Sequence, residues 1–212
     1  LDGRDDVTLA PEHNGDLAIR RHIAVNEDLL TLLGFHVAEG SCSDRGGIRL
    51  SIGKGNSRFL EEMSQRLARV FGLPPQIYHS AGRCSELKLV HRVAALAWQH
   101  CFGFAGAEST TKRIPDLVFN VGPELRAAFL RGYLLGDGTT GGGRLSFTTS
   151  SYDLASGILY LLSSMGVVAS LSELQPDGVV REIRGAPCQT KHPYWTLSVT
   201  AAEDLRKLES VW

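Results

Sequence analysis

Two apolar runs of helical character repeat along the chain, and each ends in a carboxylate followed by a glycine. Residues 32–40 read Leu-Leu-Gly-Phe-His-Val-Ala-Glu-Gly, and residues 130–138 read Leu-Arg-Gly-Tyr-Leu-Leu-Gly-Asp-Gly. Each run carries two small residues four positions apart, which therefore share one helical face: Gly34 and Ala38, and Gly132 and Gly136. We expect the two helices to pack along these faces, so that Glu39 and Asp137 emerge at the same end of the pair.

Two carboxylates at neighbouring helix C-termini predict a cation site. A helix C-terminus carries partial negative charge, and two like charges at short range raise the energy further. The arrangement is therefore favourable mainly if a divalent cation lies between Glu39 and Asp137. Mg²⁺, or Mn²⁺ in its place, suits such a site because Mg²⁺ prefers oxygen ligands and keeps several waters.

The pattern around the first run predicts a defined series of elements. Asn26 is a suitable N-cap for a helix that continues to about Ala38, and Ser57 for an amphipathic helix that ends at Gly72. Alternating or β-rich segments predict strands at 48–52, 76–80 and 85–89, and a further helix is expected over 90–101.

The second run is followed by a similar series. A helix is expected to start at 122–124, and the glycines of 138–143 are expected to lead into a strand at 144–148. A helix over 152–165, strands at 167–174, 179–184 and 194–199, and a closing helix from Ala201 complete the series. The fold class is therefore α+β, a pseudo-twofold duplicated αββαββα unit. We expect an N-terminal arm or linker at 1–25, a first half at 26–115 and a second half at 116–212.

Composition allows a sizeable core but does not by itself indicate a partner. The 212 residues are 43% hydrophobic, and 22 Lys+Arg against 23 Asp+Glu give a net charge of −1. Nucleic-acid-binding domains are often basic overall, so any such function here must depend on where the cations lie. Four scattered cysteines without a Cys-x-x-Cys pair indicate neither a zinc site nor a disulfide framework and predict a cytoplasmic protein. No run is long enough to predict a membrane span.

The two runs resemble the paired motifs of LAGLIDADG homing endonucleases. Gly34 and Gly132 match the third position of the motif, Glu39 and Asp137 its acidic eighth, and Gly40 and Gly138 its closing ninth. Glutamate at the first acidic position departs from the usual aspartate. The Lys-Arg-Ile-Pro segment at 112–115 resembles a block found upstream of the second motif in members of the family that reside in inteins.

The resemblance implies a fold in which the two motif helices pack together and antiparallel sheets form a DNA-binding saddle. It implies a monomeric, Mg²⁺-dependent endonuclease that hydrolyses both strands of a long, pseudo-palindromic DNA site. Glu39, Asp137 and Gly138 would form the metal site, and Lys112 and Lys191 would be the active-site lysines. The implied DNA-contacting residues lie mainly on the outward faces of the strands: Arg49, Ser51, Lys54, Lys88, Arg144, Ser146, Thr148, Arg181 and Arg184.

An intein origin implies that the domain was once embedded in a protein-splicing domain and a host protein. The chain does not begin with Cys or Ser and does not end in His-Asn, so we expect it not to splice itself. Two alternatives stay open. A decayed relative would bind DNA or RNA without cleaving it, and a structural or interaction domain would show no salt-dependent DNA binding.

Overall fold

The structure is a computed structural model that describes residues 6–12, 17–79, 84–106, 108–183, 186–209 and 211. The chain divides into two compact units. The first comprises Leu1–Ala107, Pro115–Gly136 and Ser210–Trp212, and the second comprises Glu108–Ile114 and Asp137–Glu209.

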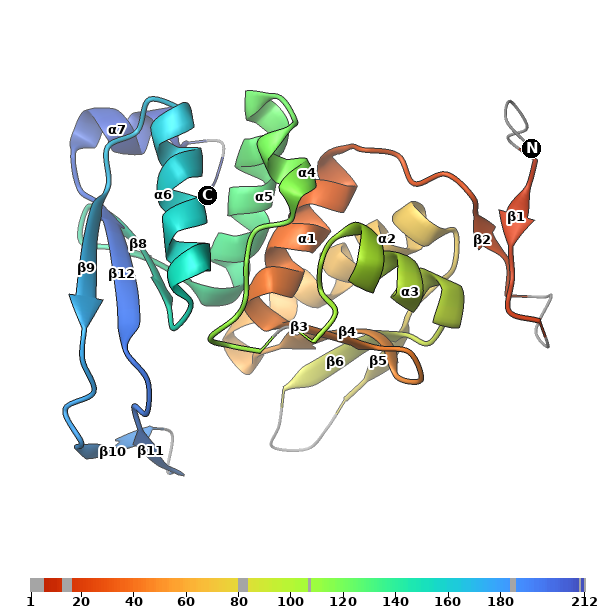
Figure 1. Cartoon of the computed structure of the whole chain (residues 1–212), viewed down its shortest axis with the longest axis horizontal. Coiled ribbons are helices and arrows are strands. Elements are labelled where there is room, and N and C mark those ends of the chain that lie inside the picture. The colour runs from red at the N-terminus through yellow and green to blue at the C-terminus, as the bar shows by residue number, and fades with distance from the viewer. Residues whose placement is uncertain are drawn as a thin grey trace. The chain divides into compact units, whose positions relative to one another are not determined.

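The first unit contains a four-stranded antiparallel sheet with helices on one face (Figure 1). Its strand order is β3-β4-β6-β5, formed by Gly40–Ser43, Gly47–Ile52, Ser85–Leu89 and Gln76–Tyr78. The helices that cover it are α1 (Glu27–Glu39), α2 (Leu60–Phe71) and α3 (Arg92–Cys101). The remaining elements are β1 (Thr8–Leu9), β2 (Ile19–Arg20), the 3₁₀ helix η1 (Lys54–Phe59), α4 (Asp116–Phe119) and α5 (Pro123–Asp137).

The second unit repeats this topology. Its sheet order is β7-β8-β12-β9, formed by Gly138–Gly141, Arg144–Thr149, Tyr194–Val199 and Ser170–Leu174. Helix α6 (Tyr152–Ser164) packs on β8 and β12, and α7 (Ala202–Lys207) follows the last strand. An additional ribbon, β10 (Val180–Ile183) with β11 (Ala186–Gln189), lies between β9 and β12 in sequence. The predicted α+β fold with a duplicated αββαββα order is confirmed.

Helices α1 and α5 pack backbone to backbone within the first unit. A Cβ atom at Gly34 would overlap the carbonyl oxygen of Phe129, and one at Gly132 would overlap the carbonyl oxygen of Thr31. The side chains around this contact are fully buried, among them Leu30, Leu33, Phe35, Leu130 and Tyr133. The predicted pairing of the two motif helices through their small residues is thus confirmed, because only glycine permits so close an approach.

Several local predictions are wrong in detail. Ser57 does not cap α2, because it lies inside the preceding 3₁₀ helix and α2 begins at Leu60. Strands β3 and β7 were not expected, since Gly-Ser-Cys-Ser and Gly-Thr-Thr-Gly show no apolar alternation. Pairing with β4 and β8 satisfies their backbone groups instead. By contrast, Asn26 caps α1 as predicted, accepting from the Leu29 N–H at 3.1 Å.

Candidate functional site

Glu39 is the last residue of α1, and its position is fixed by the contact with α5. The side chain is half-buried. A Cβ atom at Gly136 would lie 3.1 Å from Glu39 Cγ and would overlap the Ala38 side chain. Because Gly136 has no side chain, α5 leaves room for Glu39 at this point. Gly136 is also the residue that precedes Asp137 in the chain.

Asp137 is the last residue of α5, and within the second unit its charge interacts with that of Lys112. Loss of hydration raises the pKa of the Asp137 carboxyl above its ordinary value, and the positive charge of Lys112 partly opposes this rise. The side chain still has a large accessible surface, so nearby protein atoms reduce its hydration without enclosing it. A cation at this carboxylate would relieve the cost of its ionisation.

Lys112 is held by a buried serine at the start of α6. The Ser151 hydroxyl donates to the Lys112 carbonyl oxygen at 2.5 Å and accepts from the Leu154 N–H at 3.2 Å, where it caps the helix. Ser151 is 1% exposed. The same side chain thus begins α6 and fixes the backbone that carries the predicted lysine.

The other predicted residues of the active site lie at strand ends. Gly138 begins β7 and is half-buried. Lys191 is exposed and lies between β11 and β12. The structure relates Lys112 to Asp137 through the charge interaction described above, whereas the role of Lys191 rests on the sequence alone.

The donor set suits a hard divalent cation. Within the described ranges, no three His, Cys, Asp or Glu side chains gather closely enough to hold an ion between them. Mg²⁺ does not need such a group, because it commonly uses one or two carboxylates and takes its other ligands from water and substrate phosphate. The two carboxylates that the sequence predicts, Glu39 and Asp137, match that requirement in number.

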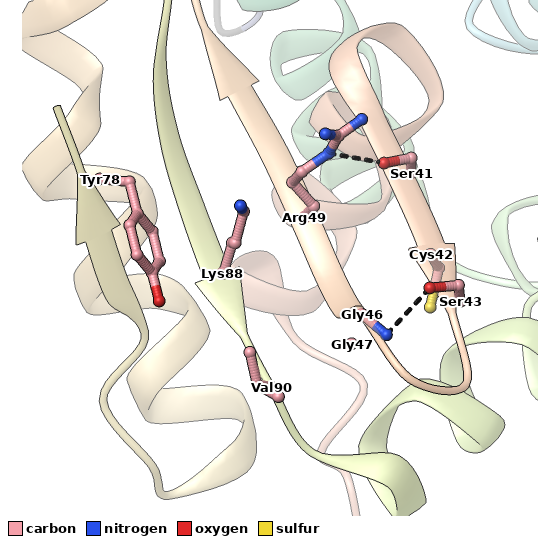
Figure 2. Close-up of a pocket in the computed structure, with 9 residues that line it drawn as sticks. All are labelled: Ser41, Cys42, Ser43, Gly46, Gly47, Arg49, Tyr78, Lys88 and Val90. Carbon is pink, nitrogen blue, oxygen red and sulfur yellow. Dashed lines mark hydrogen bonds between the residues drawn. The ribbon is translucent and has the colours of Figure 1, made fainter. Parts of the chain in front are cut away.

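The open face of the sheet in the first unit carries the predicted cations of β4 and β6. Figure 2 shows Arg49, Lys88 and Tyr78 on three adjacent strands, lining a pocket of about 490 Å³ that extends to the β3–β4 turn. The Arg49 Nε–H donates to the Ser41 hydroxyl at 2.9 Å, and Lys88 Nζ lies 4.7 Å from the centre of the Tyr78 ring. Ser51 is half-buried on the same strand as Arg49. The alternation that predicted an outward polar face for β4 is confirmed.

Sequence reasoning missed three residues of this face: Ser41, Tyr78 and Glu86. Glu86 forms ion pairs with both cations, at 3.5 Å to Arg49 and 2.8 Å to Lys88. Its position two residues before Lys88 in an alternating strand was a usable signal, because residues i and i+2 share a face. Ser41 gave no such signal, since β3 has no apolar alternation.

The predicted DNA-contacting residues of the second sheet differ from one another in exposure. Arg144 and Thr148 are exposed on β8, and the Thr148 hydroxyl lies 3.2 Å from that of Thr196. Ser146 shares their face but is only 8% exposed, so the expectation of an exposed side chain there is wrong. Ser146 belongs to β8, which pairs with both β7 and β12, and its Oγ lies 3.4 Å from Ser198 Oγ.

Three further predicted DNA contacts cannot be placed as side chains. Arg184 lies outside the described residues, and the side chains of Lys54 and Arg181 are also outside them, although their backbones belong to η1 and β10.

Among the helices of the described chain, none combines the length and apolar character needed to cross a bilayer.

A known protein family matches most of the second half of the chain. Residues 124–212 match the family described as "LAGLIDADG-like domain". This match begins at the start of α5 and therefore includes the second motif, with Asp137 and Gly138.

Curated relatives contain a similar segment within much longer proteins. A DNA polymerase of Thermococcus hydrothermalis is 27% identical over 183 residues, which is 78% of this chain and 10% of that protein. An A-type ATP synthase subunit of Pyrococcus abyssi is 25% identical over 178 residues, 82% of this chain and 17% of that protein. The chain thus spans about a tenth of the length of the first of these relatives and about a sixth of the second.

Solved structures share the fold. Homing endonuclease I-DmoI, in complex with DNA and Mn, has a TM-score of 0.61 at 12% identity, covering 89% of this chain and 97% of that one. Full-length DUF199/WhiA from Thermatoga maritima has a TM-score of 0.54 at 18% identity, covering 89% and 56%. The chain therefore has the α+β fold of LAGLIDADG homing endonucleases, and its residues 124–212 match a LAGLIDADG-like domain.

Proposed function

We propose that this chain is a site-specific DNA endonuclease of the homing type, which hydrolyses both strands of a long, pseudo-palindromic target. The observation that carries the proposal is the packing of α1 on α5 through Gly34 and Gly132, with Gly136 against Ala38 and Glu39. Two similar helices, one from each half of the chain and each ending in a carboxylate, suit a pseudo-palindromic substrate. Each half of the chain can then act on one strand of the DNA.

In this proposal Glu39 and Asp137 hold the divalent cation, with Gly138 beside Asp137. A bound Mg²⁺ or Mn²⁺ would lower the pKa of a water and neutralise charge on the phosphate undergoing attack. Lys112 is suited to hold that phosphate as a point charge, since its own charge is already felt at Asp137. Lys191 is the proposed counterpart in the second half.

The two sheets are proposed to read the DNA from the major groove. Arg49 and Arg144 are exposed guanidinium groups that can pair with a guanine through two hydrogen bonds. Ser51, Thr148 and the other outward residues would adapt to several bases. With one copy of each half in a single chain, the active species is proposed to be a monomer.

We further propose that the domain derives from an intein. A DNA polymerase and an ATP synthase subunit have unrelated activities, yet each contains a segment similar to most of this chain. A mobile element inserted into different host genes accounts for this distribution. The Lys-Arg-Ile-Pro segment at 112–115 supports the same origin.

A second candidate is a DNA- or RNA-binding module without cleavage. Glu39 favours it, because the additional methylene places the first carboxylate differently from an aspartate. The assignment of Lys191, which rests on the sequence alone, leaves room for it as well. Such a module would keep the sheet faces but have no need for a metal.

Replacement of Asp137 by Asn tests the cleavage function. The substrate is a randomised DNA library from which cleaved sites are selected in the presence of Mg²⁺. We expect Asp137→Asn to abolish cleavage of the selected site and to leave its binding nearly unchanged, because the amide keeps the shape but loses the charge that holds a cation.

Asp153→Asn is the matched control, since Asp153 is an exposed carboxylate of α6 in the same unit. It should cut like the parent chain. Cleavage by Asp137→Asn at the parent rate would contradict the assignment of Asp137 as a ligand of the divalent cation. A parent chain that binds DNA but selects no cleaved site would favour the binding module.

A further inference from the structure

Two cations face each other directly on the sheet of the first unit. Arg49 of β4 and Lys88 of β6 are paired in register. Like charges opposite each other on antiparallel strands are destabilising, so this arrangement needs a compensating group. Glu86, opposite Ser51 on the same face, supplies that group.

The Glu86 carboxylate contacts one cation with each oxygen. Oε1 lies 3.5 Å from Arg49 Nη1, and Oε2 lies 2.8 Å from Lys88 Nζ. Glu86 and Lys88 are 29% and 30% exposed at their side chains, whereas Arg49 is 45% exposed. The carboxylate is therefore accessible enough to act on a bound polyanion.

Arg49 also contacts Ser41 of β3, on the other side from Lys88. The two contacts, to Ser41 and Glu86, leave some of the guanidinium N–H donors available. The Arg49 Nε–H donates to Ser41 at 2.9 Å, and one Nη1–H points toward Glu86. A guanidinium has five N–H donors, so three remain for a ligand. In Figure 2 the end of the Arg49 guanidinium projects beyond the Ser41 contact, away from Lys88.

We propose that Glu86 is a specificity-determining residue that suppresses sequence-independent DNA binding by holding Arg49 and Lys88 on the sheet. This inference rests on the proposed function, and it identifies how a polar face discriminates among DNA sites. A base edge can be reached by the remaining Arg49 donors while the contacts to Ser41 and Glu86 persist. A backbone phosphate that approaches the same donors meets the negative charge of the Glu86 carboxylate, and Lys88 must leave that carboxylate in order to pair with the phosphate.

The physical basis is the large share that phosphate contacts have in non-specific affinity. Each phosphate neutralised by a Lys or Arg releases counterions, so affinity falls with salt in proportion to the number of such contacts. Neutralising Glu86 would free a cation for one further phosphate contact. The expected signature is therefore tighter binding with a steeper salt dependence, whereas a loss of folding would remove phosphate contacts and weaken binding.

The experiment compares the parent chain with Glu86→Gln in binding to a mixed-sequence DNA duplex, over a salt series without divalent metal. Fluorescence anisotropy gives the dissociation constants. We expect Glu86→Gln to bind about fivefold more tightly. The slope of log affinity against log salt should be steeper by about 0.9, which corresponds to one additional phosphate contact.

Two variants serve as controls. Glu61→Gln makes the same change in net charge at an exposed position of α2, where Glu61 accepts a hydrogen bond from Gln65 at 2.8 Å. Glu86→Asp keeps the charge on the sheet. Both should have the slope of the parent, and adding Arg49→Gln to Glu86→Gln should remove most of the gain.

Equal shifts in Glu86→Gln and Glu61→Gln would overturn the inference, because net charge alone would then explain them. An unchanged slope in a folded Glu86→Gln protein would overturn it as well, while leaving the proposed function intact. If the parent chain shows no salt-dependent DNA binding, the proposed function and this inference both fail.

Discussion

Ser151 stabilises two segments of the second unit with a single hydroxyl. It accepts from the first turn of α6 and donates to the carbonyl oxygen of Lys112, and it also donates its own N–H to Thr149 Oγ1 at 3.1 Å. At the residue scale, the backbone that carries the predicted lysine is thus held by the same serine that caps α6. Glu86 has a comparable double role on the sheet of the first unit, between Arg49 and Lys88.

Replacing Ser151 with Ala should therefore cost more than the loss of an ordinary cap. We expect a decrease in the free energy of unfolding of about 2–4 kcal/mol, since an N-cap contributes about 1 kcal/mol and the half-buried Lys112 carbonyl would also lose its hydrogen bond from Ser151. Urea denaturation measures this difference. Asn26→Ala is the control, because Asn26 caps α1 without a second contact of this kind, and it should cost about 1 kcal/mol. Equal losses in the two variants would show that the bond to Lys112 contributes nothing.

At the scale of elements, the contact between α1 and α5 depends on the absence of side chains at two glycines. Glycine is a poor helix former, by about 1 kcal/mol relative to alanine. Its presence at Gly34 and Gly132 is explained by the opposing backbones, which leave no room for a methyl group. The helices α1 and α5 were predictable from their apolar runs, and their contact from the spacing of the small residues.

Replacing Gly132 with Ala tests this contact. In an isolated helix the change would stabilise, but here the new Cβ would overlap the Thr31 carbonyl oxygen and lie 2.9 Å from the Phe35 nitrogen. We expect a net loss of about 1–3 kcal/mol or more in the free energy of unfolding. Gly53→Ala is the matched control: Gly53 has a φ of −60° and open space around it, so alanine there should be neutral or stabilise by up to about 1 kcal/mol. A Gly132→Ala chain as stable as the parent would contradict the packing of the two helices.

At the scale of the whole chain, the duplicated sequence builds two sheets of equivalent order, and α5 of the second repeat packs in the first unit. A network of ion pairs supports the packing of α5 against α1 and α2 in the first unit. Arg66, with a side chain only 9% exposed, forms ion pairs with Glu27, Asp28 and Glu62, and Arg131 of α5 lies 3.8 Å from Glu27. Three helices are thus joined at the end of α1 opposite to Glu39.

This network predicts how stability depends on pH. Hydrogen bonding to Arg69, supported by the charges of Arg69 and Arg66, lowers the pKa of Asp28 below its ordinary value of about 3.9. A carboxyl with a lowered pKa in the folded state stabilises fully above its unfolded pKa, and this contribution disappears as pH falls through the folded pKa. Asp28→Asn should therefore lose about 1–3 kcal/mol at neutral pH. The difference from the parent should shrink steadily below about pH 4.

Urea denaturation over a pH series measures that difference. Asp44→Asn, an exposed carboxylate in the β3–β4 turn of the same unit, is the control and should follow the parent at every pH. A constant difference between Asp28→Asn and the parent down to acidic pH would contradict the assigned cause.

The sequence by itself determined the order of the main helices and of the apolar strands, the pairing of the motif helices and the positions of Glu39 and Asp137 at their ends. These features are local, because periodicity, caps and glycine stops act within a few residues. Only the tertiary structure decided which polar residues are accessible and what they contact. Strands β3 and β7 exist because β4 and β8 supply hydrogen bonds, Ser146 is covered by its neighbours, and Glu86 meets Arg49 across the sheet. Such contacts join residues far apart in the chain, and their geometry is set by strand register and packing, which no local pattern encodes.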